Sequence, residues 1–142
     1  MNKISLTLPA VVCISVFLIL QSCREEIIGP DNFGGSKNQP IKIRSQNSYI
    51  FLIDAHEMSS LFPDYPFIKV DKTIMSLSVI GYENGTLEIN IYNPAKQLFY
   101  QRLVNRNLET IRVELDGEVP GYVEFNFSNF TGKLKFQLTR VD

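Results

Sequence analysis

The chain has 142 residues, with 14 Lys and Arg against 15 Asp and Glu, so its formal net charge at pH 7 is −1. This balance argues against a broad basic surface for nucleic acid. Its length fits one main domain, and two cysteines with a single histidine offer little material for disulfides or a metal site. We therefore expect no cofactor, no metal and no nucleic-acid partner.

Residues 1–22 are predicted to be a lipoprotein signal peptide. Lys3 supplies a positive charge, and an apolar run over residues 4–20 follows, interrupted by Pro9. This run is shorter than the roughly 20 apolar residues that a membrane-spanning helix needs. It ends in the sequence LQSC, which resembles a bacterial lipobox and implies cleavage before Cys23 and lipidation of that cysteine. A plain signal peptide and a single-span anchor are the alternatives.

Residues 23–45 are predicted to comprise the lipidated Cys23 and a flexible tether, because glycines and prolines interrupt the segment and it has no apolar period. Two or more acyl chains hold a protein stably at a membrane. We expect the protein to be anchored through this lipidated N-terminus in the outer membrane of a Gram-negative cell. Glu25 and Glu26 resemble the export signal of Bacteroidota surface lipoproteins, and both the cell surface and the periplasmic face stay open.

Residues 46–142 are predicted to form one β-sandwich domain. Ile41 and Ile43 alternate with cations and indicate a first edge strand before it. Alternation of apolar and polar residues is typical of antiparallel sheets with one wet face. Seven or eight such strands without a helix predict an all-β, immunoglobulin-like antiparallel sandwich. The seven main segments are short and rich in β-branched and aromatic residues: 49–54, 73–82, 86–93, 97–104, 109–115, 121–127 and 133–141.

A β-hairpin is predicted at residues 83–85. A two-residue loop would place Val79 opposite Asn90, which pairs an apolar with a polar side chain. A three-residue loop places Val79 opposite Ile89, so we expect this register, with Gly85 in the left-handed conformation.

No catalytic residue is expected. His56 lies two residues after Asp54, but a metal site needs three or four ligands, and a polar strand end is the simpler interpretation. Ser59 and Ser60 lie close to His56 in sequence without a Gly-x-Ser-x-Gly elbow or an oxyanion hole to activate them. Four acids are expected at outward positions where they are merely solvated: Glu88, Glu114, Glu118 and Glu124.

Residues 61–68, LFPDYPFI, form the one segment with the composition of a binding loop. Its aromatic residues Phe62, Tyr65 and Phe67 are held by two prolines, and such rings stack on sugars or fill a partner's pocket. The alternative, which we favour, is that Phe62 and Phe67 cap the core of a small domain that needs its apolar side chains.

Five segments are notable within residues 73–140: LEINIYN (87–93), LFY (98–100), IRVELD (111–116), PGY (120–122) and GKLKF (132–136). Together they resemble the small Bacteroidota sandwich domains of unknown function, which are similar in pattern to type IX secretion sorting domains. The resemblance implies a sandwich and transfers no catalytic residue. A lipid anchor at the N-terminus argues against a sorting role. The segment PGY also departs from the family pattern, because it lacks the residue that the family has between glycine and tyrosine.

Two functions are compatible with these features. The first, which we favour, is a non-enzymatic envelope module that binds a protein or a glycan. The second is a structural, pilus-like subunit that assembles through edge strands. The sequence leaves the oligomeric state open.

Overall fold

Six antiparallel strands form the fold of residues 35–141, the part of the chain that the computed structural model describes. The predicted all-β class is confirmed, and no helix able to cross a membrane occurs within these residues. The signal peptide and Cys23 lie outside them. The strands are β1 (Ile41–Arg44), β2 (Ser48–Asp64), β3 (Lys72–Tyr92), β4 (Leu98–Val104), β5 (Leu108–Asp116) and β6 (Tyr122–Arg140).

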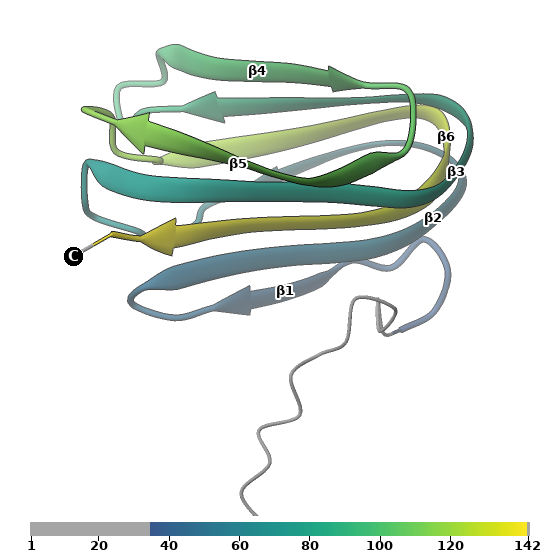
Figure 1. The fold of residues 1–142 in the computed structure, drawn as a ribbon, viewed down its shortest axis with the longest axis horizontal. Helices are drawn as coiled ribbons and strands as arrows, with labels where there is room; N and C mark the ends of the chain where they lie inside the picture. Colours follow the sequence, from purple (N-terminus) through teal and green to yellow (C-terminus); the bar gives the residue numbers. More distant parts are fainter. Residues whose placement is uncertain (1–34, 142) are drawn as a thin grey trace, which may run out of the picture. The chain divides into compact units, whose positions relative to one another are not determined.

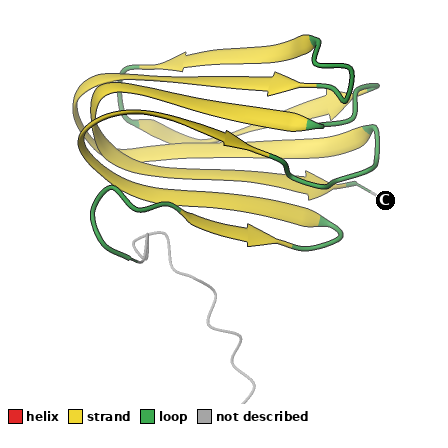
Figure 2. Ribbon diagram, turned by 180° about the vertical axis from the view of Figure 1, so that it is seen from behind, coloured by secondary structure: helices red, strands yellow, loops and turns green. Residues whose placement is uncertain are grey.

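Three of the strands are long and bent, so that one sheet folds over into two layers (Figures 1 and 2). β2, β3 and β6 have 17, 21 and 19 residues, and each contributes one half to each layer. The first half of β3 pairs with β5, and its second half pairs with β4. β1 and β5 therefore form the edges of one layer, and β4 forms an edge of the other.

The predicted hairpin at residues 83–85 is wrong. Both halves of β3 pair with β6, which places Val79 opposite Leu134 and Ile89 opposite Phe125. Gly85 nevertheless has the positive φ that the sequence predicts, 79°. The Asn-Gly pair marks a bend within one long strand, where the register with β6 shifts. It does not mark a reversal of chain direction.

The same difference accounts for the strand count of six, against seven or eight expected. Segments 73–82 and 86–93 are the halves of β3, and segments 121–127 and 133–141 belong to β6. Residues 55–64, for which the sequence predicts no strand, form the second half of β2. The bends share a backbone feature, since each contains residues with positive φ: Glu57 in β2, Gly81 and Gly85 in β3, and Asn129 and Gly132 in β6.

The hydrophobic core lies between the two layers and is rich in aromatic rings. Phe51, in the first half of β2, stacks on Phe125 in the first half of β6 with ring centroids 4.1 Å apart. Phe136, in the second half of β6, meets Phe125 edge-on at 5.1 Å. All three side chains are fully buried. Because β6 supplies rings to both layers, its bend is part of what closes the core.

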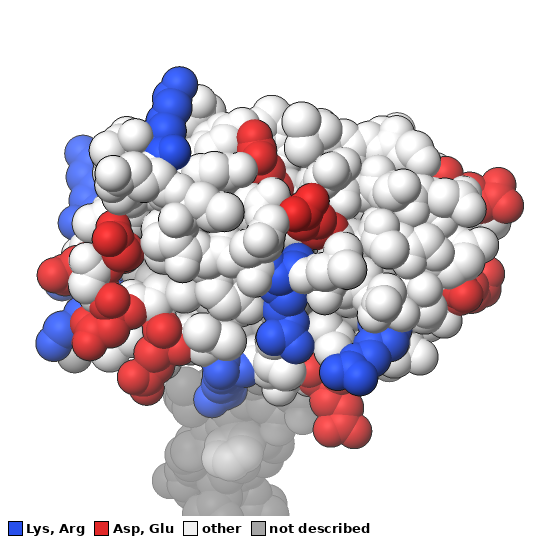
Figure 3. Space-filling model, turned by 90° about the horizontal axis from the view of Figure 1, so that it is seen from above, with Lys and Arg blue, Asp and Glu red and all other residues white. Residues whose placement is uncertain are grey.

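Acidic and basic side chains are interspersed on the face shown in Figure 3, and no area of a single sign covers it. This arrangement suits a solvated surface.

Candidate functional site

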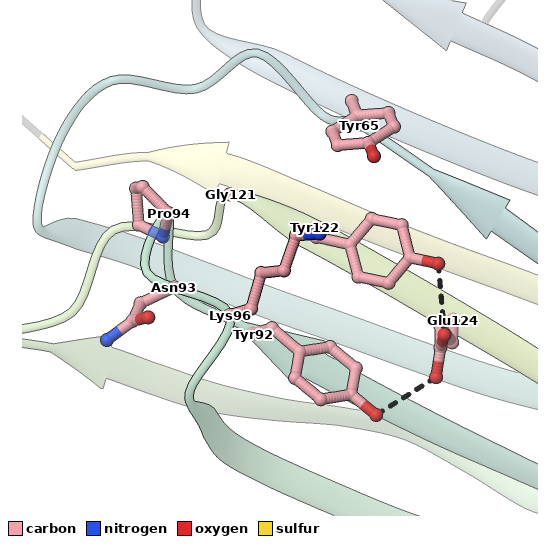
Figure 4. Close-up of a pocket in the computed structure, with 8 residues that line it drawn as sticks. All are labelled: Tyr65, Tyr92, Asn93, Pro94, Lys96, Gly121, Tyr122 and Glu124. Atoms are coloured by element: carbon pink, nitrogen blue, oxygen red, sulfur yellow. Dashed lines mark hydrogen bonds between the residues drawn. The ribbon is translucent and has the colours of Figure 1, made fainter.

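A pocket of about 500 Å³ lies where β2 and β3 end and β6 begins. We call it the tyrosine pocket, and Figure 4 shows the arrangement of its residues. It is lined by Tyr65, Tyr92, Asn93, Pro94, Lys96, Gly121, Tyr122 and Glu124.

Strand alternation places the key side chains on the outer face. In β6, Val123 and Phe125 are buried, so Tyr122 and Glu124 point the opposite way. Tyr92 of β3 lies directly across from Tyr122. The three tyrosines form a row, because the ring centroid of Tyr122 lies 5.1 Å from that of Tyr65 and 5.5 Å from that of Tyr92. The rings are tilted relative to one another, with interplanar angles of 53° and 49°. They therefore form walls of the pocket and do not make one flat stacking surface.

Glu124 connects two of these rings through hydrogen bonds. The Tyr92 hydroxyl donates to Oε2 of Glu124 and the Tyr122 hydroxyl donates to Oε1, each at 2.9 Å. Burial, together with the hydrogen bond to Glu124, raises the pKa of Tyr122 to about 12, and the same causes raise the pKa of Tyr92. Both phenols therefore keep their protons at neutral pH and fix the orientation of the carboxylate.

Close backbone contact forms one wall of the pocket. The Gly121 N–H donates to the Tyr92 carbonyl oxygen at 2.9 Å. A β-carbon on Gly121 would lie 2.7 Å from the Pro94 nitrogen, so only glycine allows this approach. The turn itself is held by Asn93, whose Oδ1 accepts from the Gln97 N–H at 3.0 Å. The turn thereby positions Lys96 at the pocket.

The three predicted binding-loop residues separate in the structure. Phe62 lies in β2 and packs on the core, with ring contacts to Phe51 and Phe127 at 6.1 and 5.8 Å. Phe67 is 66% exposed and Tyr65 is 52% exposed. Of the three, Tyr65 alone lines the tyrosine pocket.

A buried carboxylate anchors the chain beside Tyr65. Asp64 ends β2 and accepts hydrogen bonds from the Tyr49 hydroxyl at 2.7 Å, from the Tyr65 N–H at 2.9 Å and from Arg44. Lys42 Nζ lies 3.3 Å from it. Burial works against ionisation of Asp64, but these hydrogen bonds and the Lys42 charge outweigh it and lower its pKa. β1 and the start of the 65–71 connection are thus tied to one side chain.

The other sequence candidates have structural roles in the described region. His56 lies at the bend of β2, where its backbone N–H donates to Asn38 Oδ1 at 2.7 Å. Ser59 Oγ accepts from the Asn129 N–H at 2.9 Å and so joins the bends of β2 and β6. Within residues 35–141 no three His, Cys, Asp or Glu side chains come together as metal ligands would.

Sequence reasoning missed the role of Glu124 and the two tyrosines that bind it. Glu124 was expected to be only solvated, yet it is hydrogen-bonded to two phenols. The spacing of Tyr122 and Glu124 by two residues already places them on one strand face. Their proximity to Tyr92 depends on β3 pairing with β6, which the predicted hairpin did not include.

No protein-family model and no curated protein matches the chain. Solved structures show low similarity. A chain from the disulfide-linked pili of Bacillus endospore appendages is 9% identical with a TM-score of 0.39, over 77% of this chain and 96% of that one. A chain from the glycosylation-associated protein complex Gap123 of Streptococcus agalactiae is 14% identical with a TM-score of 0.37, over 78% and 43%. Capsular polysaccharide assembling protein CapF of Staphylococcus aureus is 9% identical with a TM-score of 0.26, over 72% and 31%. Similarities at this level do not indicate function.

Proposed function

We propose that this chain is a lipid-anchored binding protein of the cell envelope that holds a glycan in the tyrosine pocket without altering it chemically. The observation that carries the proposal is the row of Tyr65, Tyr122 and Tyr92 beside the oriented carboxylate of Glu124. Ligand sites combine apolar walls with a few fixed polar groups. Tyrosine supplies both, because its ring packs on the apolar face of a sugar while its hydroxyl hydrogen-bonds.

The pocket chemistry favours binding over hydrolysis. Glycoside hydrolysis uses two carboxyl groups about 5–10 Å apart on either side of the scissile bond. Glu124 is the one carboxylate among the lining residues of this pocket, and both its oxygens accept hydrogen bonds from phenols. A rigid acceptor of this kind is suited to orienting a ligand.

Glycan arrays test the proposal with the full chain in detergent micelles. Tyr122→Ala should abolish binding of any glycan that the unaltered protein retains, because it removes the central ring of the row. Tyr100→Ala, on β4 outside the pocket, is the matched control and should retain binding. Absence of glycan binding, or capture of a protein ligand that survives Tyr122→Ala, would contradict the proposal.

Membrane attachment is proposed through acylated Cys23, which lies outside the described residues. Two or more acyl chains give stable anchoring. Cys23→Ser should therefore release the protein from the membrane fraction of cells and abolish its labelling by a palmitate analogue. Membrane retention of this variant would contradict the lipid anchor while leaving the pocket proposal intact.

A structural subunit is the second candidate, and the free edge of β4 favours it. β4 pairs with β3 on one side and with no described strand on the other. Leu98 and Leu103 on this strand are 47% and 61% exposed. Such an edge is a template for pairing with another chain.

Antiparallel pairing of two β4 strands about Gln101 would place Phe99 of one copy opposite Leu103 of the other, with no acidic or basic residues of like sign opposed. Sedimentation over a wide concentration range tests this. Leu103→Lys should dissociate a dimer, whereas Leu61→Lys, at a similarly exposed leucine on β2, should not. A protein that stays monomeric at the highest concentration argues against assembly through this edge.

A further inference from the structure

The carboxylate of Glu124 has no positively charged partner within the described residues. Asp64 pairs with Lys42 and Arg44, and Asp54 pairs with Lys133. Two further half-buried acids, Glu88 and Glu118, form no ion pair within the described residues either. Glu124 is half-buried, beside two aromatic rings that also shield it from water. A carboxylate in such surroundings is stabilised by a nearby cation, and no ion pair within residues 35–141 provides one to Glu124.

Hydrogen-bond polarity at the pocket indicates the same kind of ligand. The Tyr92 and Tyr122 hydroxyls each have one proton, and both protons are donated to Glu124. What these three groups still offer a ligand is lone pairs on the phenol oxygens and the carboxylate. The part of the pocket around Glu124 therefore presents hydrogen-bond acceptors, and it favours a ligand group that brings several donors.

From this arrangement we infer that the tyrosine pocket selects a glycan that carries a protonated amine, that is, an amino sugar whose nitrogen is not acylated. An ammonium group donates three hydrogen bonds and accepts none, which matches the acceptors around Glu124. It is also attracted to the faces of the tyrosine rings, a cation–π interaction that strengthens where water is excluded. This inference rests on the proposed glycan-binding function and specifies its ligand.

Lys96 opposes this selection. It is exposed, and the 93–97 turn places it among the pocket-lining residues, where its charge repels an incoming ammonium. It forms no ion pair with Glu124. Because exposed charges are well screened, we expect its effect to be smaller than that of Glu124. Lys96→Gln should therefore strengthen binding of an amino sugar, and more so at low salt.

Calorimetric titration of the full chain in detergent tests the inference with three oligosaccharides of equal length. Chitosan oligosaccharides carry free amines, their fully N-acetylated counterparts are neutral, and oligogalacturonates carry carboxylates. We expect the amine form to bind about tenfold more tightly than the N-acetylated form, and the acidic form to bind most weakly. Butylammonium, followed by NMR of the tyrosine rings, reports amine binding without any sugar.

Charge removal at Glu124 is the decisive variant. Glu124→Gln keeps the side-chain shape and should remove the preference for the amine, so that the amine and N-acetylated forms bind this variant with affinities within about twofold of each other. Glu114→Gln, on β5 in the other layer, is the matched control and should keep the preference. Circular dichroism and ring NMR shifts confirm that each variant is folded.

The possible outcomes separate the inference from the proposed function. Equal or tighter binding of the neutral or acidic form, or an amine preference that survives Glu124→Gln, overturns the inference and leaves glycan binding standing. Butylammonium binding that depends on Glu124, without binding of any oligosaccharide, supports an amine site and overturns the glycan proposal. Failure of all four ligands overturns both.

Discussion

Gly85 packs directly against the backbone of Asn129, so that a β-carbon on Gly85 would lie 2.1 Å from the Asn129 carbonyl oxygen. Gly85 is in the bend of β3 and Asn129 is in the bend of β6, and both have positive φ. The two bends are thus in contact, and only a residue without a side chain fits between them. This contact lets two paired strands pass together from one layer to the other.

Gly85→Ala should destabilise the fold strongly. Alanine is strained in the left-handed conformation, and its β-carbon would also clash with backbone atoms that cannot rotate away. We therefore expect a loss of about 2–4 kcal/mol in the free energy of unfolding. Gly81→Ala is the matched control, because Gly81 also has positive φ but has no atom within 4 Å of the added carbon. It should cost only about 1 kcal/mol. Urea denaturation measures both, and equal losses would refute the contact between the bends.

Tyr49→Phe should make the protein less stable near neutral pH and change its response to acid. The Tyr49 hydroxyl donates to buried Asp64 at 2.7 Å, and a hydrogen bond to a charged group contributes about 2 kcal/mol. Because the folded state lowers the pKa of Asp64, its stabilisation is complete above the ordinary value of 3.8 and is lost as the pH falls through the lower folded pKa.

Urea denaturation over a pH series tests this coupling. Tyr49→Phe removes a hydrogen bond that lowers the Asp64 pKa, so the difference in stability between the two proteins should shrink as the pH falls below the ordinary value of 3.8. Tyr100→Phe, outside this network, should leave the acid response unchanged. A constant difference between Tyr49→Phe and the parent at every pH would argue against the coupling.

The local character of the strands could be read from the sequence, whereas their continuity could not. Alternation identifies segments 73–82 and 86–93 correctly as β structure, because it reports which face of a strand is buried. The Asn-Gly pair between them is compatible both with a hairpin turn and with a bend in a continuous strand, so the local sequence does not distinguish the two. Pairing with β6, about 45 residues further along the chain, decides between the two, and a local pattern does not contain that information.

The same limit applies to the candidate site. Tyr65 was identified because its segment is locally unusual, rich in rings and proline. Tyr92, Tyr122 and Glu124 each occupy an ordinary outward strand position, and only the pairing of β3 with β6 brings Tyr92 to the other two. A site assembled across strands can therefore be predicted only after the strand order is known.

Alkaline titration should reveal Tyr122 as a late-titrating phenol. Its pKa is raised to about 12 from the ordinary value of 10.0, first by burial and then by Glu124. Because the pKa is higher in the folded state, the protonated phenol stabilises the fold fully below the unfolded-state pKa of about 10. This stabilisation is lost as the pH rises from 10 towards 12. Phenolate absorbance should show one less late-titrating group in Tyr122→Phe. Glu124→Gln should lower the Tyr122 pKa only partly, because burial persists; a full return to the ordinary value would assign the shift to Glu124 alone.

Substitutions in the 61–68 segment should separate core packing from binding. Phe62→Ala removes a half-buried ring that contacts Phe51 and Phe127, and it should cost about 2–4 kcal/mol in the free energy of unfolding. Tyr65→Ser should change stability by less than about 1 kcal/mol, because Tyr65 is half-exposed and mainly contacts Tyr122.

Ligand binding should respond in the opposite order. Tyr65→Ser removes one wall of the pocket and should weaken glycan binding, whereas Phe62→Ala should leave binding intact at temperatures where the variant is folded. Phe67→Ala serves as the control for exposure, since Phe67 is 66% exposed but does not line the pocket, and it should affect neither property. Thermal denaturation and titration on the same samples give both readouts. If Phe67→Ala alone weakened binding, the ligand would contact the 65–71 connection instead of the tyrosine row, and the site would have to be placed there.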